Sequence, residues 1–527
     1  MREFVQIRQF LVNVSLCSAF YPYQESCATT YNVHDAKEEL KYPSPKSLDA
    51  REVPLVFGKL GFSEKEDVLK FILEKNIKIL NLCHIPEEGR LKVLSFSTAE
   101  KDRISEVLEY GERADGSSLF SFIEPNRSDI YISPRISRAF IDPFAMLPTL
   151  NIPSDYLNED GKPLEVAPQS VLARAQEKLN RSSNITLKAL AELEFYIVAK
   201  HQSEPLFQGV PDKNYHEGSP FAKFEEIRNE ALATLALIGI PTKYGHSEVG
   251  RIESSDGTIM EQHEIEFIPQ NLGDMAETIV ISKWIIRNIC LRHGVSVSFI
   301  PKIDLDHAGN GMHIHMCGFK RNLNIVANSH RELSNEALSM IGGILKFAPS
   351  LAAFGNPTPV SYLRFIARKE SPIHICWSAQ DRLALIRIPL WWKFKQAEKR
   401  KASSETFEYR APDAFANPCL LFSGLTLAAD WGLENAKESL ELAEDLHACP
   451  MQEDEKNFRV LPRSCSESAH HLQKDRKLYE VDGVFPGRLI DKIVHRLNDY
   501  KDRNLWRDIL KKPEELQKVL AQYLHYG

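Results

Sequence analysis

Two histidines stand two residues apart in the segment GNGMHIHM, residues 309–316. His313 and His315 would project from the same face of an extended chain, because successive side chains of a strand alternate between its two faces. The same spacing occurs in hydrogen-bonded strand faces and in metal sites. The pair alone leaves both interpretations open, and the residue types elsewhere in the chain have to decide between them.

Two acidic segments offer the partners that a metal site would need. In AELEFYIV, Glu192 and Glu194 share one face, and in EQHEIEFIP, Glu264 and Glu266 do the same. Like charges at these positions repel each other, so a cation should lie between them unless the face is open to solvent. The apolar run LEFYIV favours burial of the first pair, and therefore favours the cation.

The segment YGHSEVG adds His246 and Glu248 to this set. Carboxylates from several strands together with an imidazole are typical of sites for a hard divalent ion such as Mg²⁺ or Mn²⁺. No cysteine accompanies them, which argues against structural zinc.

Arginines come next along the chain, in SYLRFIARKE, SAQDRLALIRIP and FEYRAPD. The charged residues of these segments are Arg364, Arg368, Glu370, Arg382, Arg387, Glu408 and Arg410. Guanidinium groups bind carboxylates and phosphates through paired hydrogen bonds, so the set suits a carboxylic acid and a phosphoryl group in transfer. Surface ion pairing is the alternative for any single arginine. The sequence contains no P-loop, nucleophile-elbow or Rossmann glycine motif.

Sequence patterns predict the elements that must position these residues. SEKEDVLKFILEKN predicts a helix capped by Ser63, and IKILNLCHI and LKVLSFS predict paired strands, within an α+β unit that ends near Phe144. From Pro168 onward, VLARAQEKL, FEEIRNEALATLALIG and MAETIVISKWIIRNICLRHG predict helices. They alternate with the acidic strands and with SVSFIPK and GMHIHMCGF, which favours a mixed catalytic domain of helices and sheet.

Composition limits the classes of function. The 527 residues are too many for one small core, so we expect at least two domains. A net charge of -7 gives no case for nucleic acid or an anionic membrane as partner. The nine cysteines are scattered, which favours a reducing, cytoplasmic setting over a disulfide framework. No uninterrupted apolar run is long enough to span a bilayer.

Taken in order, the motifs resemble those of one family, glutamine synthetase, and most closely its bacterial type I enzymes. The resembling segments are ADGSS (114–118), AELEF (191–195), HSEVG…EQHEIEF (246–267), GNGMHIH (309–315), NPTPVSYLRF (356–365), SAQDRLALIRIP (378–389) and FEYRAPDAFANPCLLFSGL (407–425). The resemblance implies an α+β fold. Residues 51–145 would form a β-grasp domain and residues 146–527 a catalytic domain with a curved antiparallel sheet and surrounding helices. Residues 1–50 would be an extension of unknown role.

The resemblance also implies two divalent ions, Mg²⁺ or Mn²⁺, in each site. The residues that match ligands of the first ion are Glu194, Glu248 and Glu264. Those that match ligands of the second are Glu192, His313 and Glu408. Glu266 lies on a suitable face, but the family pattern does not use it.

Other matches concern the substrates, which are implied to be ATP, glutamate and ammonia. The residues that match glutamate-binding positions are Gly309, Arg364 and Arg410, and those that match nucleotide or phosphate contacts are His315, Arg382 and Arg387. Glu370 matches a flap glutamate that closes over the reaction centre. Asp115 resembles an aspartate that a neighbouring subunit contributes to an ammonium site, which implies a homo-oligomer, a dodecamer of two hexameric rings.

The implied activity is that of an ATP-dependent glutamate–ammonia ligase. Transfer of the γ-phosphoryl group of ATP would turn a carboxylate oxygen of glutamate into a leaving group, and cations would offset the negative charge of that step. Asp115 would accept a proton from ammonium, and ammonia would then attack γ-glutamyl phosphate. Arg382 would stabilise the phosphoryl group, and the flap that carries Glu370 would exclude water.

Three departures from the family pattern leave other activities open. Ala308, Cys317 and Thr406 replace an asparagine, a serine and a basic residue, and residues 390–405 form an insertion. One alternative is a ligase that joins glutamate to a larger amine, such as an alkylamine or a polyamine. Another is a catalytically silent paralogue that acts as a scaffold, although the matched metal-ligand positions are all retained.

Overall fold

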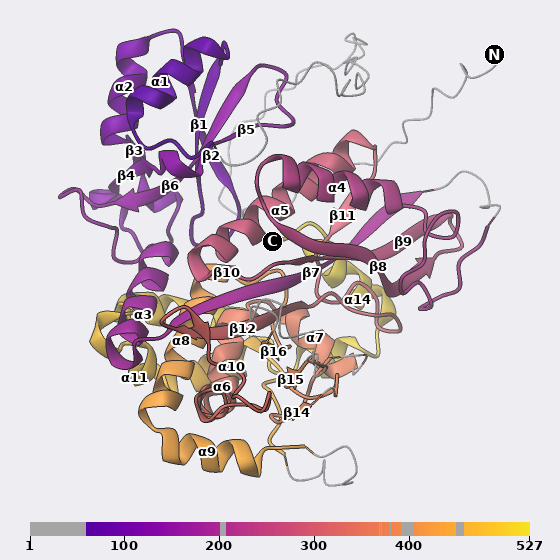
Figure 1. Cartoon of the computed structure of the whole chain (residues 1–527). Helices are drawn as coiled ribbons and strands as arrows, with labels where there is room; N and C mark the ends of the chain where they lie inside the picture. The colour runs from indigo at the N-terminus through magenta and orange to yellow at the C-terminus, as the bar shows by residue number, and fades with distance from the viewer. Residues whose placement is uncertain are drawn as a thin grey trace, which may run out of the picture. The chain divides into compact units, whose positions relative to one another are not determined.

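The computed structural model describes residues 60–200, 207–367, 369, 371–379, 381–390, 405–448 and 458–527. By its contacts the chain divides after Val53, and all of these residues belong to the second unit, Pro54–Gly527. They form helices and two sheets (Figure 1), so the expected mixed fold of helices with a curved, mainly antiparallel sheet is confirmed. The domain boundary expected near residue 145 stays a prediction.

The first sheet has six strands. Its order is β2 (Lys92–Ser97), β1 (Ile79–His84), β6 (Thr149–Leu157), β4 (Asp129–Pro134) and β3 (Glu112–Asp115), with β5 (Phe140–Ile141) paired to β6. β1 runs parallel to β6 and antiparallel to β2, so it lies inside the sheet. Helices α1 (Lys65–Glu74) and α2 (Lys101–Tyr110) pack against each other beside this sheet.

Two details of this region differ from the sequence-based expectation. The first helix begins at Lys65 with Glu64 as its N-cap, so the expected cap by Ser63 is wrong. Two acidic residues of the first turn, Glu66 and Asp67, interact with the positive end of the helix dipole instead. Strand β1 pairs with β2 as predicted, but it is buried over nearly its whole length, whereas a strand with one solvent-facing side would be buried only at alternate residues.

The second sheet has ten strands and carries most of the chemistry-bearing residues. Its order is β14 (Trp377–Ala379), β15 (Ile386–Ile388), β16 (Phe407–Tyr409), β12 (Met312–Lys320), β7 (Thr186–Lys200), β9 (Thr258–Phe267) and β8 (Thr242–Glu253). Three short strands pair at its margins: β10 (Gln270–Asn271), β11 (Ser296–Ser298) and β13 (Leu323–Asn324). β11 covers only part of the expected strand SVSFIPK. The long strand β7 lies between β12 and β9, so side chains from all three meet on one face.

The register between β7 and β9 aligns three polar pairs. Glu192 lies opposite Glu266, Glu194 opposite Glu264, and Tyr196 opposite Gln262. Side chains alternate along both strands, so these three pairs share a face, while Leu193 and Phe195 enter the core on the other face. Two pairs of like charge stand directly opposite each other, an arrangement that costs free energy unless a cation neutralises it.

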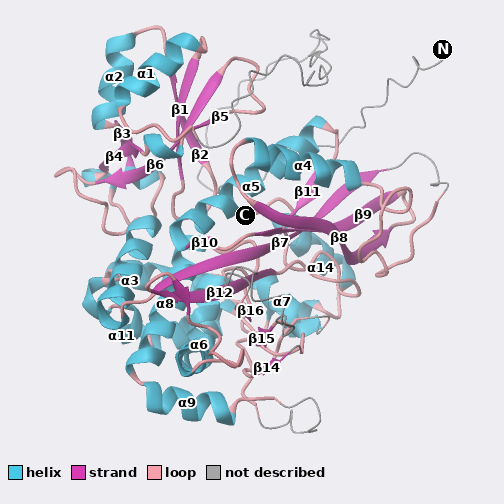
Figure 2. Ribbon diagram, in the orientation of Figure 1, coloured by secondary structure: helices cyan, strands magenta, loops and turns pink. Residues whose placement is uncertain are grey.

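Helices cover the second sheet. In Figure 2, α4 (Glu225–Leu237) and α5 (Leu272–Arg292) lie beside the long strands, and α5 packs on β7 while α4 packs on β8. The helices of the remaining core are α3 (Pro168–Ser183), α6 (Asn335–Gly355), α7 (Pro359–Ala367), α8 (Pro418–Glu434), α9 (Ala436–Asp445) and α10 (Cys465–Lys474). Nearer the C-terminus follow α11 (Arg476–Tyr479), α12 (Gly487–Asp499), α13 (Leu505–Ile509) and α14 (Pro513–Tyr523).

Helix α6 is the single described helix whose length and apolar composition would allow it to cross a membrane. Within the fold, 89% of its most apolar window is buried, and it packs against α8, α9 and α10. A helix that is apolar on all sides is expected in the core of a large domain as well as in a bilayer. Here α6 is a core helix.

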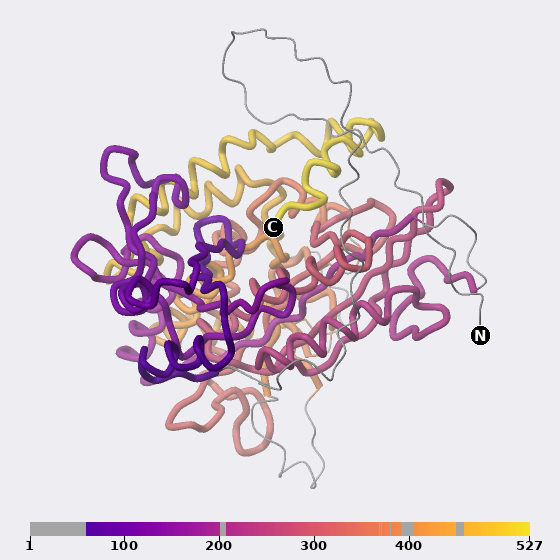
Figure 3. Tube along the Cα trace, turned by 90° about the horizontal axis from the view of Figure 1, so that it is seen from above, coloured from indigo at the N-terminus to yellow at the C-terminus, as the bar shows by residue number. Residues whose placement is uncertain are grey.

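Ion pairs and the chain end tie the elements around α5 together. Glu277 of α5 accepts hydrogen bonds from Arg138 at 2.8 and 3.1 Å and pairs with Arg135, both in the segment that follows β4. The path of the chain from α14 to the C-terminus can be followed in Figure 3. At that terminus the Gly527 carbonyl accepts a hydrogen bond from Arg287 of α5. The first sheet and the C-terminus are therefore both fastened to the helix that lies behind β7.

Candidate active site

A cavity of about 750 Å³ lies over the polar face of the second sheet. Most of the residues singled out from the sequence line it: Glu192, Glu194, Glu248, Glu264, Gly309, His313, His315, Arg364, Arg382, Arg387 and Arg410. Glu408 lies just behind this wall, with its carboxylate 3.6 Å from Nδ1 of His313. The structure therefore brings together residues that are up to about 220 positions apart in the chain, from Glu192 to Arg410.

Among the described residues, Asp115 is expected at the site but does not line this cavity. Asp115 ends β3 in the first sheet, where its exposed carboxylate accepts hydrogen bonds from the hydroxyls of Ser117 and Ser118, both at 2.7 Å. These bonds favour the charged form and hold the pKa of Asp115 well below its usual value. Glu370, with Arg368, lies outside the described residues, and so does nearly all of the insertion 390–405, including Trp391 and Trp392.

One group of ligand-type side chains comes from strands β7, β8 and β9. The carboxylates of Glu248 and Glu264 and the imidazole of His246 place donor atoms within 4.8 Å of one another. Nε2 of His246 is 3.1 Å from Oε1 of Glu264. Glu194 lies opposite Glu264 across the ladder, and its Oε2 accepts a hydrogen bond from the Gly311 backbone N–H at 2.7 Å.

A second group comes from β7, β12 and β16. Glu192, His313 and Glu408 again place donor atoms within 4.8 Å of one another, as do Glu192, Glu266 and His315. The carboxylate of Glu192 bridges the two imidazoles, with 2.7 Å to Nδ1 of His313 and 2.9 Å to Nε2 of His315. Glu192 is thus common to both sets of this second group, and it is absent from the group of His246, Glu248 and Glu264.

The two groups differ in electrostatics. Burial, together with the charges of Glu192, Glu194, Glu248 and Glu266, raises the pKa of Glu264 well above its ordinary value. At Glu192 burial acts in the same direction, but the imidazoles of His315 and His313 outweigh it and hold the pKa well below the ordinary value. The carboxylates around Glu264 are therefore crowded with negative charge, while Glu192 has positive partners.

Arginines line the same cavity. Arg387 donates to Glu408 at 2.8 Å, and Arg410 pairs with the other oxygen of that carboxylate. The Nε atoms of Arg387 and Arg410 are buried and have no hydrogen-bond partner among the described residues. Arg364 is 2% exposed and is anchored by the carbonyls of Ala411 and Pro412 at 3.0 and 3.1 Å. Buried, incompletely used guanidinium groups of this kind suit an anionic ligand.

The sequence-based interpretation missed several residues of this wall, among them Tyr215, Lys243, Tyr244 and Gln262. Gln262 had a signal, because it stands two residues before Glu264 and shares its face of the strand. Lys243 forms an ion pair with Glu266 at 2.6 Å, which neutralises the one carboxylate that the family pattern leaves unused. Tyr215 comes from an exposed loop, and no local pattern marks it.

The donor set fits hard divalent ions. It consists of carboxylate oxygens and imidazoles, without thiolates, and its Glu264 cluster is short of positive charge. Hard ions such as Mg²⁺ and Mn²⁺ prefer these ligands. Thr406, one of the departures from the family pattern, places its hydroxyl 3.1 Å from Nδ1 of His315.

Comparison with known proteins identifies the family. Residues 165–503 match the model of the glutamine synthetase catalytic domain. The glutamine synthetase of Thermotoga maritima is 31% identical over 430 residues, which cover 79% of this chain and 92% of that protein. A 3-hydroxylaminophenol mutase of Cupriavidus pinatubonensis is 30% identical over 460 residues, covering 81% of this chain and 93% of that protein.

Solved structures agree in fold. A cryo-electron-microscopy structure of glutamine synthetase from Plasmodium falciparum superimposes with a TM-score of 0.71 at 20% identity, covering 84% of this chain and 97% of that one. A complex of GmaS with ADP superimposes with a TM-score of 0.66 at 18% identity, covering 85% and 97%.

The matched family, together with a cavity lined by carboxylates, histidines and arginines, defines the class of the protein as a metal- and ATP-dependent ligase. The chain belongs to the glutamine synthetase family, a family of ATP-dependent ligases that use divalent metal ions and act on small molecules as oligomers.

Proposed function

We propose that the chain is a glutamate–ammonia ligase that forms glutamine through γ-glutamyl phosphate at the expense of ATP. The observation that carries the proposal is the composition of the cavity wall. The wall combines crowded carboxylates with buried guanidinium groups that have unused donors. Such a wall suits a reaction in which a polyanion transfers a phosphoryl group to a carboxylate.

Glu194, Glu248 and Glu264 would hold one Mg²⁺ or Mn²⁺ ion, and Glu192, His313 and Glu408 a second. When bound, the ions would neutralise the negative charge that gathers where the phosphoryl group is transferred. The chain's own contribution is to keep these side chains fixed on five paired strands, so that little reorganisation is needed when the substrates bind.

Arg364 and Arg410, beside Gly309, would bind the carboxylates of glutamate, and Arg382 and Arg387 would bind phosphate oxygens, with His315 in contact with the nucleotide. Arg382 is exposed and close to Tyr215, so it is accessible to a phosphoryl group entering from solvent. Guanidinium forks bind both kinds of anion through paired hydrogen bonds.

The acceptor side of the site is proposed to be completed by another subunit. Asp115 is exposed on the first sheet and retains a charged carboxylate with a low pKa, as a group that binds ammonium must. It would enter the cavity of a neighbouring copy in a dodecamer of two hexameric rings, and Glu370 would close that cavity as part of a flap. A cationic acceptor as small as ammonium needs a closely placed carboxylate.

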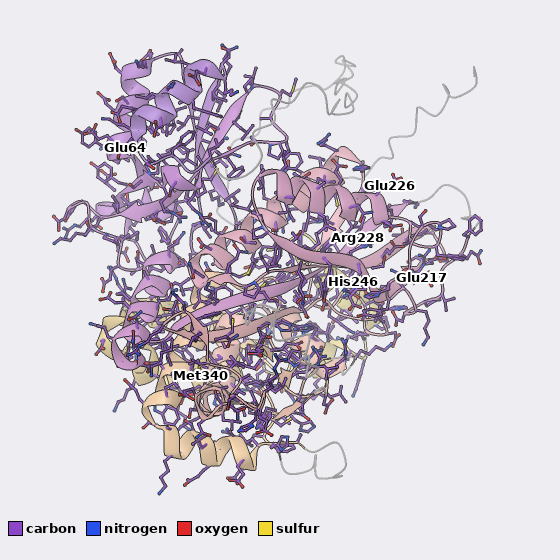
Figure 4. The ribbon with its side chains drawn as sticks, in the orientation of Figure 1. Glu64, Glu217, Glu226, Arg228, His246 and Met340 are labelled. Atoms are coloured by element: carbon purple, nitrogen blue, oxygen red, sulfur yellow. The ribbon has the colours of Figure 1, made fainter. Side chains whose placement is uncertain are left out.

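A second candidate is a ligase for a larger amine. A hollow of about 460 Å³ shares Tyr215, Tyr244 and His246 with the main cavity, and Glu217 and Arg228 also line it. Figure 4 labels His246, Glu217 and Arg228 in the same part of the molecule. The hollow offers space for a chain attached to the amine nitrogen. This observation keeps alkylamines and polyamines as rival acceptors.

The test is phosphate release from ATP in the presence of glutamate and Mg²⁺, with ammonium compared against methylamine, ethylamine and putrescine. The proposal expects ammonium to give the highest kcat/KM. If ammonium gave no turnover while an alkylamine did, the second candidate would replace the first. Failure to bind ATP in the presence of Mg²⁺ would instead indicate a silent paralogue.

A further inference from the structure

The third pair of the polar ladder, Tyr196 and Gln262, has no role in the mechanism proposed above. Both side chains lie on the same face as the acidic pairs, one step further along the strands. Tyr196 is fully buried and Gln262 is 1% exposed. Neither residue is charged, so they do not extend the carboxylate cluster. Their polar atoms point instead at the loop that precedes β12.

That loop has three successive backbone carbonyls held by buried side chains. Lys302 donates to the carbonyl of His307, the Tyr196 hydroxyl donates to Ala308 at 2.8 Å, and Nε2 of Gln262 donates to Gly309 at 3.0 Å. Nε2 of Gln262 also lies 3.2 Å from Oε2 of Glu194. Three consecutive peptide groups are therefore fixed by side chains from three different parts of the sequence.

The residues that follow are fixed as well. The backbone N–H of Asn310 donates to the Pro301 carbonyl at 2.9 Å, and its side-chain amide donates to the Ile300 carbonyl at 2.9 Å. The Gly311 N–H donates to Glu194. Because a trans peptide places its N–H opposite its carbonyl, the bond from Tyr196 to Ala308 turns the N–H of Gly309 away from Tyr196.

Gly309 itself belongs to the cavity wall, beside Arg364. A methyl group on Gly309 would overlap the Pro301 carbonyl and come within 3.0 Å of Cγ of Arg364. Ala308 carries no polar side-chain atom, and 4% of it is exposed. Ala308 and Gly309 can therefore contact a ligand's polar groups only through their backbone. Such a contact requires that the orientation of this backbone is maintained.

Gly250 provides the space in which the two holding side chains meet. Its N–H donates to Oε1 of Gln262 at 2.9 Å, which orients the amide so that Nε2 faces the loop. A methyl group on Gly250 would overlap the Tyr196 hydroxyl and come within 2.7 Å of Oε1 of Gln262. Glycine at this position is therefore required by close approach of two side chains.

We propose that Tyr196 and Gln262 are positioning residues that orient the Ala308–Gly309 backbone towards the carboxylate substrate. Lys302 holds the preceding carbonyl, and Gly250 leaves the space that the two side chains need. The inference rests on the proposed function, in which that substrate is glutamate. It deepens that function, because it assigns recognition of the glutamate carboxylate to a backbone held by side-chain hydrogen bonds, and not to a side chain at position 308.

The first experiment compares Tyr196→Phe with Tyr362→Phe. Tyr362 is an equally buried tyrosine whose hydroxyl donates to Ser468 at 2.7 Å, away from the cavity wall. Removing the Tyr196 hydroxyl leaves a buried carbonyl without its donor, an effect on the order of tenfold in an equilibrium constant. The KM for glutamate should rise about tenfold in Tyr196→Phe, with kcat and the KM for ATP changing less than about twofold.

The second experiment compares Gly250→Ala with Gly273→Ala. Gly273 lies in the first turn of α5, where an added methyl group would meet nothing within 4 Å. Gly250→Ala should raise the KM for glutamate more than Tyr196→Phe does, because it displaces both holding side chains. Binding of ATP, measured by calorimetry, reports whether the variant is folded, and Gly273→Ala should match the wild type in both readouts.

A third readout does not depend on turnover. Amide hydrogen exchange at residues 308–311 should be slow in the wild type and in Tyr362→Phe, and faster in Tyr196→Phe, without added substrate. If the wild type shows no glutamate-dependent phosphate release, the proposed function fails and this inference fails with it. If the wild type is active but Tyr196→Phe leaves the KM for glutamate and the exchange unchanged, this inference alone is overturned.

Discussion

Strand β9 buries carboxylates on both of its faces, and the two faces differ in how they balance the charge. Glu261 faces the core, where it pairs with Arg251 at 2.9 Å and accepts backbone N–H bonds from Lys223 and Phe224 at 2.9 and 3.2 Å. Glu264 faces the cavity, where its neighbours are mainly other carboxylates. The exposed fractions are 0% and 5%, so burial does not distinguish them.

The pKa shifts follow from the partners. Burial opposes ionisation of Glu261, but the contact with His263 and the backbone N–H groups outweigh it, and its pKa lies below the ordinary value. Burial and four neighbouring carboxylates raise the pKa of Glu264. Glu261, whose charge is balanced by protein groups, therefore stabilises the fold. Glu264, whose neighbours are other carboxylates, is instead suited to binding a cation.

The largest expected effect is on activity at the cavity face. Glu264→Gln should lower kcat/KM by roughly a thousandfold, because a metal ligand worth several kcal/mol is lost. The same change removes a group whose ionisation is opposed by burial and by the neighbouring carboxylates, so thermal unfolding of the metal-free chain should occur at the same or a higher temperature than in the wild type. A variant that lost stability but kept its activity would reverse the assignment of this face.

The matching change on the core face should affect stability. Glu261→Gln leaves the buried guanidinium of Arg251 without its buried partner, and we expect a loss of about 3 kcal/mol in the free energy of unfolding. Denaturant titration measures it, and kcat per folded molecule should stay near that of the wild type. Glu253→Gln is the control, because Glu253 is 31% exposed where it pairs with Arg251. Its loss should stay below about 1 kcal/mol.

The free energy of unfolding of the metal-free chain should depend on pH through the titration of Glu264. Above about pH 4.5 the folded state still holds a proton on Glu264 while the unfolded state has lost it, so the free energy of unfolding falls as pH rises. Glu192 and Glu408 have lowered pKa values and act in the opposite direction. Their ionised forms stabilise the folded state, and this contribution is lost as the pH falls below their ordinary pKa values. Unfolding measured from pH 4.5 to 8 should show the decline in the wild type and a flatter profile in Glu264→Gln. An unchanged slope in that variant would contradict this origin.

The smallest effect is expected at Lys243, the cation that pairs with Glu266 on the cavity face. Its side chain is 45% exposed, so Lys243→Met should change the free energy of unfolding by less than about 1 kcal/mol. Losing a positive charge from the wall should strengthen Mn²⁺ binding by roughly two- to threefold. Calorimetric titration tests this, and weaker binding in the variant would mean that Lys243 supports the site.

Local sequence patterns were sufficient to predict the shared faces of the acidic strands and several of the helices. The two-residue period of a strand predicted the shared face of Glu192 and Glu194 and that of Glu264 and Glu266, and the structure pairs these residues across a ladder. The helices α3, α4 and α5 followed from their apolar patterns. The motif order identified the family, which the comparisons confirm.

Other parts depend on contacts that no local pattern encodes. Tyr196 stands opposite Gln262 because of the register between two strands about 65 residues apart, and their loop comes from a third segment. The N-cap of α1 is Glu64 rather than Ser63, and it makes no side-chain capping hydrogen bond, so the capping pattern did not fix the exact start of this helix. Tyr215 enters the cavity from an exposed loop whose path is set by tertiary packing.

Titration of the metal-free wild type with Mn²⁺, followed by electron paramagnetic resonance of the free ion, tests the contrast between the two faces most directly. We expect saturable binding of two ions per chain, loss of one of them in Glu264→Gln, and unchanged stoichiometry in Glu261→Gln. Binding in Glu264→Gln equal to that of the wild type, or no saturable binding in the wild type, would contradict it.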